Sequence, residues 1–339
     1  MVCISLIHVN AESKRYTHYF FDTFDTLVTL IGYTEDPAAF ERIATQTEEE
    51  LFRLHKLYDA YHEYDGIENI YTINRDAATA PVHAAPEIMD MLLFTKKWQP
   101  KLNGAVNIAM GSVLQLWHEY RTLGTAHPET AALPPAALLQ EASLHTNFDD
   151  VFLDEKNSTV YFNDAKLQLD VGAVAKGYAA ELAAQMLLQS DMPNFILNVG
   201  GNVRTGNPPI NDRKNWSVSI QNPDAALGIV GDPASAETLY LSDLSVVTSG
   251  DYERFYVVDS VRYHHIISPQ TFMPSAENRS VTIVCEDSAL ADILSTAVFI
   301  LPYEEGRAIV ESLEGVEALW IRPNGDIFMT DGLEQMTKS

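Results

Sequence analysis

The hydrophobic positions along the chain follow two different spacings, which predict strands and helices respectively. Apolar runs rich in β-branched and aromatic residues predict strands, most clearly from Phe20 to Tyr33. Further strands are predicted at 216–220, 281–285, 318–321 and 327–329, within 194–206 before a double glycine, and within 244–256, with a hairpin at 148–162. Apolar residues at helical spacing predict helices at 38–58, 86–98, 135–144, 173–189, 289–301 and 304–313. The chain therefore mixes both kinds of element throughout its length.

Capping signals mark where some of these helices begin. Asp36 followed by Pro37 is typical of an N-cap and a first helical residue, and Ser288 is predicted to cap the helix at 289–301. Residues 58–74 and 121–135 are polar and are predicted to be loops. The segment 104–117 begins like a strand and ends like a helix.

The order of the elements predicts the fold class. Strands and helices are interspersed without a regular βαβ repeat, and the G-x-G-x-x-G motif of dinucleotide-binding folds is missing from the sequence. We therefore predict an α+β protein with mixed sheets and packed helices. Residues 1–18 are interpreted as an N-terminal extension, and residues 19–335 as a single domain of two intimate lobes.

Composition and charge narrow the range of partners. The chain has 339 residues with 22 Lys and Arg against 47 Asp and Glu, which gives a net charge of −25. Such a surface repels nucleic acid and anionic lipid, so neither is expected as a partner. A chain this acidic needs a local lysine, a helix N-terminus or a divalent cation wherever it binds phosphate.

The cysteines and the N-terminus indicate neither a metal site nor a membrane segment. Cys3 and Cys285 are not spaced like a metal motif, a disulfide between them stays open, and Cys285 is interpreted as a buried free thiol. The first ten residues have a short apolar run without preceding basic residues, and no transmembrane segment is predicted. At face value this predicts a cytoplasmic protein. An extracytoplasmic location is the alternative if a signal or lipoprotein segment precedes this sequence.

The stretch LDVGAVAKGYAAE at 169–181 is the first candidate site. It leads from an apolar run through Asp170 and Gly172 into an alanine-rich helix, with Lys176 in the first turn. Free backbone N–H groups and the helix dipole at such a start favour a bound anion such as phosphate. The alternative is an ordinary connection between a strand and a helix.

Asp292 and Thr296 are the second candidate site. They are four residues apart in an otherwise apolar helix, so they share one face. A carboxylate there is costly to bury unless it is paired or binds a cation, and carboxylate and hydroxyl oxygens suit Mg²⁺. The alternative is a solvated aspartate next to a threonine that bonds back to its own helix.

Two further features remain open on composition alone. Four tyrosines in residues 58–74 could cover a ring-shaped ligand or could pack as amphipathic rings. The pair His264 and His265 is expected to lie just before a strand, where adjacent side chains point to opposite faces, so only one of the two can face a site. The alternative is a pair of surface histidines.

Four segments together resemble the ApbE family of flavin transferases, which move FMN from FAD onto a protein threonine. They are LDVGAVAKGY at 169–178, LNVGGNVRTG at 197–206, TSGDYERF with HIISPQT between 248 and 271, and ADILSTA at 291–297. Their order matches the family, and the resemblance runs from about Phe21 to about Val298.

The resemblance implies a site with FAD as the substrate and Mg²⁺ as the cofactor. FAD is expected in a cleft between the N-terminal part and the glycine-rich core, in contact with Phe24, Tyr58, Val106, Asn107, Ile108, Asp170, Lys176 and Thr248. The carbonyl group of Ala173 and the side chains of Asp292 and Thr296 are the implied Mg²⁺ ligands. His265 is the implied proton acceptor.

The implied activity is Mg²⁺-dependent transfer of FMN from FAD to a threonine of an acceptor flavoprotein, with release of AMP. The chain departs from the family pattern at Phe24, Asn107, Asn202, Ser268 and Phe272. These departures affect the expected specificity for the acceptor protein more than the expected binding of the metal ion. The alternatives are an FAD pyrophosphatase that gives FMN and AMP, and a flavin-binding protein without turnover.

Overall fold

A computed structural model describes residues 13–211, 213–228 and 233–338 of the chain. Its central element is an eight-stranded sheet in the order β1-β2-β6-β7-β10-β13-β14-β15, and every neighbouring pair is antiparallel. The strands are β1 Lys14–Thr23, β2 Thr26–Thr34, β6 Phe195–Val199, β7 Asn202–Thr205, β10 Ser245–Gly250, β13 Ser280–Cys285, β14 Glu317–Ile321 and β15 Ile327–Met329. The predicted α+β class with several sheets is confirmed.

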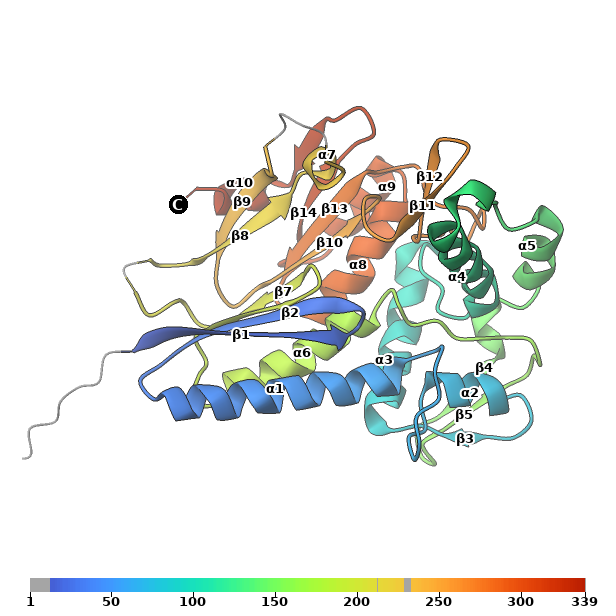
Figure 1. The fold of residues 1–339 in the computed structure, drawn as a ribbon, viewed down its shortest axis with the longest axis horizontal. Coiled ribbons are helices and arrows are strands. Elements are labelled where there is room, and N and C mark those ends of the chain that lie inside the picture. Colours follow the sequence, from blue (N-terminus) through green and yellow to red (C-terminus); the bar gives the residue numbers. More distant parts are fainter. Residues whose placement is uncertain (1–12, 212, 229–232, 339) are drawn as a thin grey trace, which may run out of the picture.

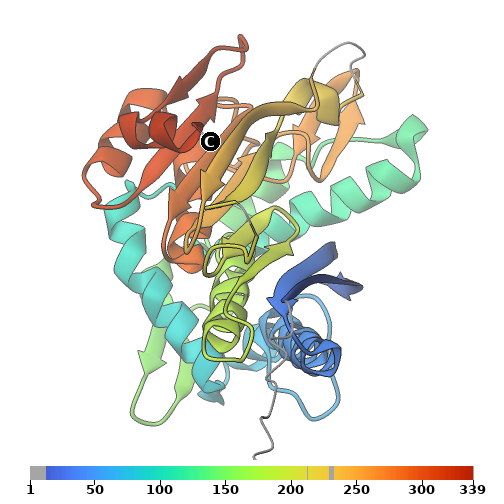
Figure 2. The same cartoon turned by 90° about the vertical axis from the view of Figure 1, so that its left-hand side faces the viewer.

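Three long helices cover one face of this sheet. They are α1 Pro37–Tyr58, α6 Ala175–Leu188 and α8 Ser288–Ile300. Their apolar side chains share one core with the inward-facing residues of β2, β6, β10 and β13. Figure 1 shows α1 and α6 running below β1 and β2, and Figure 2 looks almost along the axis of α1.

The opposite face of the sheet carries a smaller layer. The hairpin of β8 Trp216–Gln221 and β9 Ser235–Leu241 packs there with α10 Asp331–Met336, and α7 Pro223–Ala226 follows β8. Apolar residues of this hairpin meet the outward-facing residues of β10, β13 and β14. The helix α9 Tyr303–Glu311 connects α8 to β14. Each face of the sheet is therefore buried in its own core.

Two smaller units complete the chain. One combines α2 Ile70–Asp76, α3 Pro86–Trp98 and the sheet β3-β5-β4, formed by Val82–His83, Thr159–Phe162 and Val151–Asp154. The other packs α4 Gly111–Ala126 and α5 Ala136–Ser143 near the hairpin of β11 Phe255–Val258 and β12 Val261–His264. Short 3-10 turns lie at Gln99–Leu102, Pro128–Thr130 and Phe148–Asp150.

Several predicted elements are confirmed. Asp36 caps α1 through its side chain, which accepts a hydrogen bond from the backbone N–H of Ala38 at 2.9 Å, and Pro37 is the first helical residue. The helix at 86–98 and the hairpin within 148–162 also match the prediction. In these places the deciding signal is local, because a cap or a turn residue fixes the start or end of the element.

The single strand predicted from Phe20 to Tyr33 is wrong. The segment folds back on itself as β1 and β2, and the turn places Asp22, Phe24 and Asp25 in the left-handed region. Residues 14–18, which were assigned to the N-terminal extension, are part of β1. Residues 1–12, including Cys3, lie outside the described residues.

Other boundaries also differ from the prediction. Asp287, not Ser288, caps α8, because its side chain accepts hydrogen bonds from the N–H groups of Ala289 and Leu290. The predicted strand within 244–256 is broken between β10 and β11.

The predicted loops contain helices that the sequence analysis missed. The loop at 58–74 includes the start of α2, which Asn69 caps, and α4 continues through the first part of the loop at 121–135. The strand β9 was not predicted. Within the described ranges, no helix combines the length and the apolar character that a membrane span requires.

Candidate active site

The site is built where the start of α6 meets α8. The backbone N–H of Gly177 donates a hydrogen bond to Oδ2 of Asp292 at 2.7 Å. The two helices approach closely because residue 177 has no side chain. A Cβ atom there would lie 2.4 Å from Cβ of Asp292 and 2.3 Å from the carbonyl oxygen of Ser288. The motif at 169–181 and the helix at 289–301 are therefore in direct contact.

Asp292 is the buried carboxylate of this site, with 4% of its surface exposed. Burial raises its pKa, while the nearby Lys176 ammonium, the Gly177 N–H and the Asn202 amide act in the opposite direction. A buried carboxylate needs compensation by hydrogen bonds or by a cation. Lys176 is half-buried and donates a hydrogen bond to Oδ1 of Asn202 at 3.1 Å.

The start of α6 has no side-chain cap. Val174 occupies the N-cap position, and its side chain cannot accept a hydrogen bond. One of the free N–H groups expected from the sequence, that of Gly177, is donated to Asp292. Lys176 lies between these two positions, so positive charge is concentrated at this helix start.

The three predicted metal ligands are compatible with Mg²⁺. Within the described residues, the carbonyl oxygen of Ala173 accepts no backbone hydrogen bond, and the half-buried Thr296 hydroxyl has no hydrogen-bond partner. The neighbouring Ser295 hydroxyl, in contrast, bonds to the Asp292 carbonyl and to Ser249. No group of three or more His, Cys, Asp or Glu side chains with metal-binding geometry occurs in the described ranges. A single carboxylate with neutral oxygens suits an ion that keeps water or phosphate ligands.

Asp170 connects the N-terminal part of the chain to this site. Its Oδ1 accepts the Gly172 N–H at 2.9 Å, and its Oδ2 accepts the hydroxyl of Tyr61 at 2.6 Å. Its backbone N–H donates to the carbonyl oxygen of Ile108 at 2.8 Å. The predicted segment 106–108 therefore lies beside Asp170, with the side chains of Val106 and Ile108 buried in the core.

Asn107 in this segment uses its side chain internally. Its amide nitrogen donates to the carbonyl of Thr146 at 2.7 Å, and its amide oxygen accepts the N–H of Ala109 at 2.9 Å. The side chain thereby fixes the turn before α4.

Tyr61, which the sequence did not single out, reaches Asp170, whereas the predicted flavin contact Tyr58 is buried elsewhere. Tyr58 is 4% exposed, donates to the carbonyl of Glu87 at 3.4 Å and packs edge-on against Tyr178. The ring of Tyr61 stacks on His118 of α4 with 4.5 Å between centroids. The sequence indicates several tyrosines in this loop and, through the family resemblance, names Tyr58, but the loop has no regular period that would mark Tyr61 as facing Asp170.

Phe24 lies at the turn between β1 and β2, and its backbone is fixed from two sides. Its N–H donates to Nδ1 of His55 at 3.2 Å, and its carbonyl oxygen accepts from Arg254 at 2.9 Å. Phe24 thus contacts a residue of the TSGDYERF motif. Its φ of 54° is in the left-handed region, which a non-glycine residue seldom adopts.

Thr248 faces away from α8. Val246 and Val284 pack in the core beneath β8 and β9, and the alternation of side chains puts Thr248 on that same face. Its hydroxyl lies 2.8 Å from that of Thr282 in the paired strand. Ser249, the next residue, faces α8 and lies 2.9 Å from the Ser295 hydroxyl. The structure therefore does not bring Thr248 together with Asp292.

His264 is the last residue of β12 and His265 follows it, so the histidine pair lies at the end of a strand and not before one. His264 is buried, and its Nε2 lies 2.8 Å from the Ser275 carbonyl. His265 is half-buried, and its enclosed Nδ1 has no hydrogen-bond partner in the described part of the chain. The two imidazoles are thus in different environments, since both nitrogens of His264 have partners.

The surroundings of His265 are positively charged. Burial holds its pKa well below the usual value of 6.5, and Arg254, Arg121 and Lys176 lower the pKa further. Arg121 extends from α4, where its guanidinium lies 3.2 Å from Nδ1 of His118. The sequence analysis missed both arginines, because nothing in their local pattern separates them from surface arginines. They supply local positive charge on a chain of net charge −25.

A cavity of about 600 Å³ lies elsewhere, between the end of α1, the loop before α2 and β3. Its charged side chains are held in ion pairs: Arg75 contacts Glu63, His83 contacts Glu68, and Arg53 contacts Glu50 and Glu87 outside the lining. None of the predicted site residues lines it.

The fold is an α+β protein in which the start of α6, with Lys176 in its first turn, meets the buried carboxylate Asp292 of α8. Residues 24–320 match the model of the ApbE family, and the chain belongs to this family.

Two curated relatives match most of the chain. The chain is 32% identical over 321 residues to the FAD:protein FMN transferase of Treponema pallidum (strain Nichols), covering 91% of this chain and 85% of the relative. It is 30% identical over 301 residues to the FAD:protein FMN transferase of Klebsiella pneumoniae (strain 342), and this match covers 88% of this chain and 86% of the relative.

Solved structures show the same fold. The crystal structure of the ApbE protein of Thermotoga maritima matches with a TM-score of 0.82 at 29% identity, covering 96% of this chain and all of that one. The flavin transferase ApbE of Vibrio cholerae matches with a TM-score of 0.79 at 20% identity, covering 96% of this chain and 99% of that one. At this identity the likeness concerns the fold alone.

Proposed function

We propose that this protein transfers FMN from FAD to a threonine hydroxyl of an acceptor protein and releases AMP. The observation that carries the proposal is the contact between the α6 start and Asp292 within a chain of the ApbE family. The relatives from Treponema and Klebsiella carry the name of this activity. FAD has a pyrophosphate, and a helix start with Lys176 is suited to bind it.

Mg²⁺ is the proposed cofactor, held by Asp292, Thr296 and the Ala173 carbonyl group. When bound, such an ion neutralises charge on the phosphate oxygens and on the departing AMP. The donor set supports this proposal. It combines the buried carboxylate of Asp292 with the Ala173 carbonyl and the Thr296 hydroxyl, for which the described residues supply no hydrogen-bond donor. Lys176 would hold the pyrophosphate in place, and its ammonium also stabilises the ionised form of Asp292.

His265 is the proposed proton acceptor. In the transfer, the threonine oxygen forms a bond to the FMN-side phosphorus, the bond from that phosphorus to the AMP phosphate breaks, and the threonine proton moves to the imidazole. A lowered pKa keeps the imidazole neutral at pH 7, and the neutral imidazole is the form that accepts a proton. Arg254 and Arg121 would favour the negative charge that develops at the phosphoryl group.

Incubation with FAD, Mg²⁺ and a flavoprotein subunit tests the proposal, with covalent flavin detected by fluorescence in a denaturing gel. A fluorescent acceptor band that needs both the enzyme and FAD is the expected result. FMN and AMP in solution without a labelled band would instead identify an FAD pyrophosphatase. Bound FAD without any AMP would identify a flavin-binding protein.

A further inference from the structure

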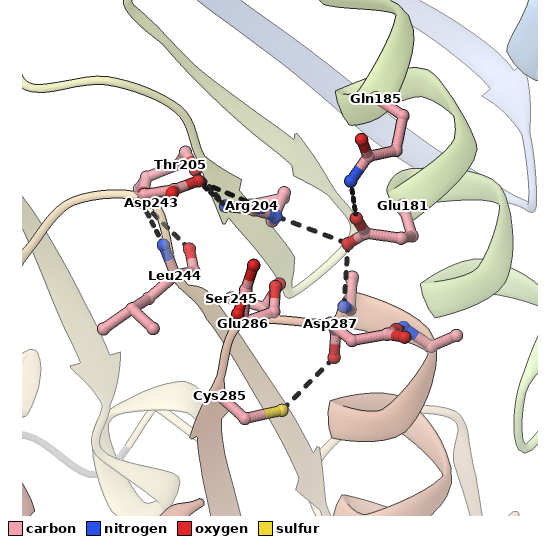
Figure 3. Close-up of polar contacts among 12 residues, drawn as sticks. Glu181, Gln185, Arg204, Thr205, Asp243, Leu244, Ser245, Cys285, Glu286 and Asp287 are labelled. Atoms are coloured by element: carbon pink, nitrogen blue, oxygen red, sulfur yellow. Dashed lines mark hydrogen bonds and ion pairs between the residues drawn. The ribbon is translucent and has the colours of Figure 1, made fainter. Parts of the chain in front are cut away.

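A buried ion pair connects β7 to α6. Arg204 of β7 is 1% exposed, and its Nε lies 3.3 Å from Oε2 of Glu181 on α6 (Figure 3). Its guanidinium also lies 3.2 Å from Oδ1 of Asp243 and donates to the carbonyl of Thr205. Because Arg204 is held at three points, it fixes the position of the Glu181 carboxylate.

The Glu181 carboxylate in turn binds the start of α8. Its Oε2 accepts the backbone N–H of Ser288 at 2.9 Å, and its Oε1 accepts the Gln185 amide at 2.6 Å. Asp287 caps the next two N–H groups of α8. Two carboxylates from different elements therefore satisfy the free N–H groups at this helix start, and only Glu181 comes from another helix.

Two hydrogen bonds, spaced one helical turn apart, connect α6 to α8. Gly177 and Glu181 are one turn apart on α6, and Ser288 and Asp292 are one turn apart on α8. Glu181 bonds to Ser288, and Gly177 bonds to Asp292. The two hydrogen bonds thus join successive turns of two antiparallel helices. A rotation or a slide of α8 that breaks the first bond also moves Asp292 relative to the α6 start.

We propose that Glu181, held by Arg204, is a positioning residue that sets the place of Asp292 for binding the divalent cation. This inference rests on the proposed function, because it takes Asp292 to be a metal ligand. Outer contacts that orient a metal ligand commonly change metal affinity by about 10–100-fold when they are removed. A purely stabilising ion pair, in contrast, would leave the metal affinity of the folded protein unchanged.

Direct binding of Mn²⁺, followed by electron paramagnetic resonance without FAD, tests this inference on the full chain. Glu181→Ala should weaken Mn²⁺ binding by about 10–100-fold while FAD binding in the absence of metal stays close to that of the wild type. Gln185→Ala is the matched control, since it removes only the contact to Oε1, and it should leave the Mn²⁺ affinity unchanged.

A second variant covers the case in which Glu181→Ala fails to fold because Arg204 is left unpaired. Glu181→Leu combined with Arg204→Met replaces the buried pair by apolar side chains, a change that folded proteins often accept. The folded double variant should show the same loss of Mn²⁺ affinity. Wild-type Mn²⁺ affinity in either folded variant would overturn the inference. An Asp292→Ala variant that binds Mn²⁺ as tightly as the wild type would also overturn it. If the wild-type protein binds Mn²⁺ through Asp292 but does not label an acceptor, the proposed function is wrong and the inference about Glu181 still stands.

Discussion

The backbone N–H of Gly177 lies 2.7 Å from Oδ2 of Asp292, and this hydrogen bond joins the two candidate motifs that are most distant in the sequence. The same contact explains why residue 177 is glycine, since any Cβ would collide with Asp292 and with the Ser288 carbonyl. Its φ is not in the left-handed region, so the close approach of the two helices is the reason for the glycine.

Gly177→Ala should disturb both stability and metal binding. The added methyl group forces α6 and α8 apart, and overpacking of this kind typically costs about 1–3 kcal/mol. Chemical denaturation should show this loss in the free energy of unfolding, and calorimetry should show weaker Mg²⁺ binding. A variant with wild-type stability and wild-type Mg²⁺ affinity would mean that the helices are not packed as described.

Asp292→Ala should abolish Mg²⁺-dependent turnover, because it removes the charged ligand from the proposed cation site. FAD should still bind through its other contacts. Thr296→Ala should be milder, because water can replace a neutral oxygen ligand. AMP release measured against Mg²⁺ concentration checks both variants. Full activity of Asp292→Ala at ordinary Mg²⁺ concentration would rule out this metal site.

Lys176→Ala should weaken the binding of FAD much more than the binding of riboflavin, because only FAD has a pyrophosphate. A charge-assisted hydrogen bond contributes about 1.5–3 kcal/mol, which corresponds to roughly a tenfold to hundredfold loss of affinity. Titration followed by flavin fluorescence gives both constants. An equal loss for the two ligands would place Lys176 outside the phosphate site.

The two histidines should respond differently to substitution. His265→Ala should lose FMN transfer by at least about a hundredfold and keep FAD binding, since loss of a general base typically costs about 10²–10⁴-fold. His264→Ala should instead lower the free energy of unfolding by about 1–3 kcal/mol, because it leaves the buried Ser275 carbonyl without its partner. The folded fraction of the His264→Ala variant should transfer FMN at the wild-type rate. An inactive but stable His264→Ala protein, together with an active His265→Ala protein, would reverse the assignment.

The pH dependence of the transfer should reflect the lowered pKa of His265. Burial and the nearby Arg254 both favour the neutral imidazole, which is the form that accepts a proton. The acid limb of kcat/KM should therefore lie well below pH 6.5. Arg254→Ala removes a positive charge, so it should raise the pKa and move the limb to higher pH. A limb that stays in place in the Arg254→Ala variant would show that another group controls it.

The sequence marked the two segments that meet at the start of α6, because each contains a short motif. The helix start at Lys176 and the carboxylate Asp292 are confirmed as neighbours, because each is marked by residues within a few positions of it. Tyr61 was not singled out, and its contact with Asp170 joins residues that are 109 positions apart. A pattern along the chain contains no signal for such a pairing.

The fold shows the same division between local and distant signals. Asp36 and Pro37 located the start of α1, because capping is a local property. The turn between β1 and β2 was missed because Asp22, Phe24 and Asp25 adopt positive φ without glycine. Arg121 and Arg254 become informative only when the tertiary structure places them around His265.

The ratio of released AMP to protein-bound flavin tests the central claim most directly. The protein, FAD and Mg²⁺ are incubated with an acceptor flavoprotein subunit, and AMP and covalent flavin are quantified in the same samples over time. The account predicts equimolar AMP and bound flavin, with AMP release depending on the acceptor and lost in Asp292→Ala. AMP release that is independent of the acceptor, without flavin on the protein, would contradict it.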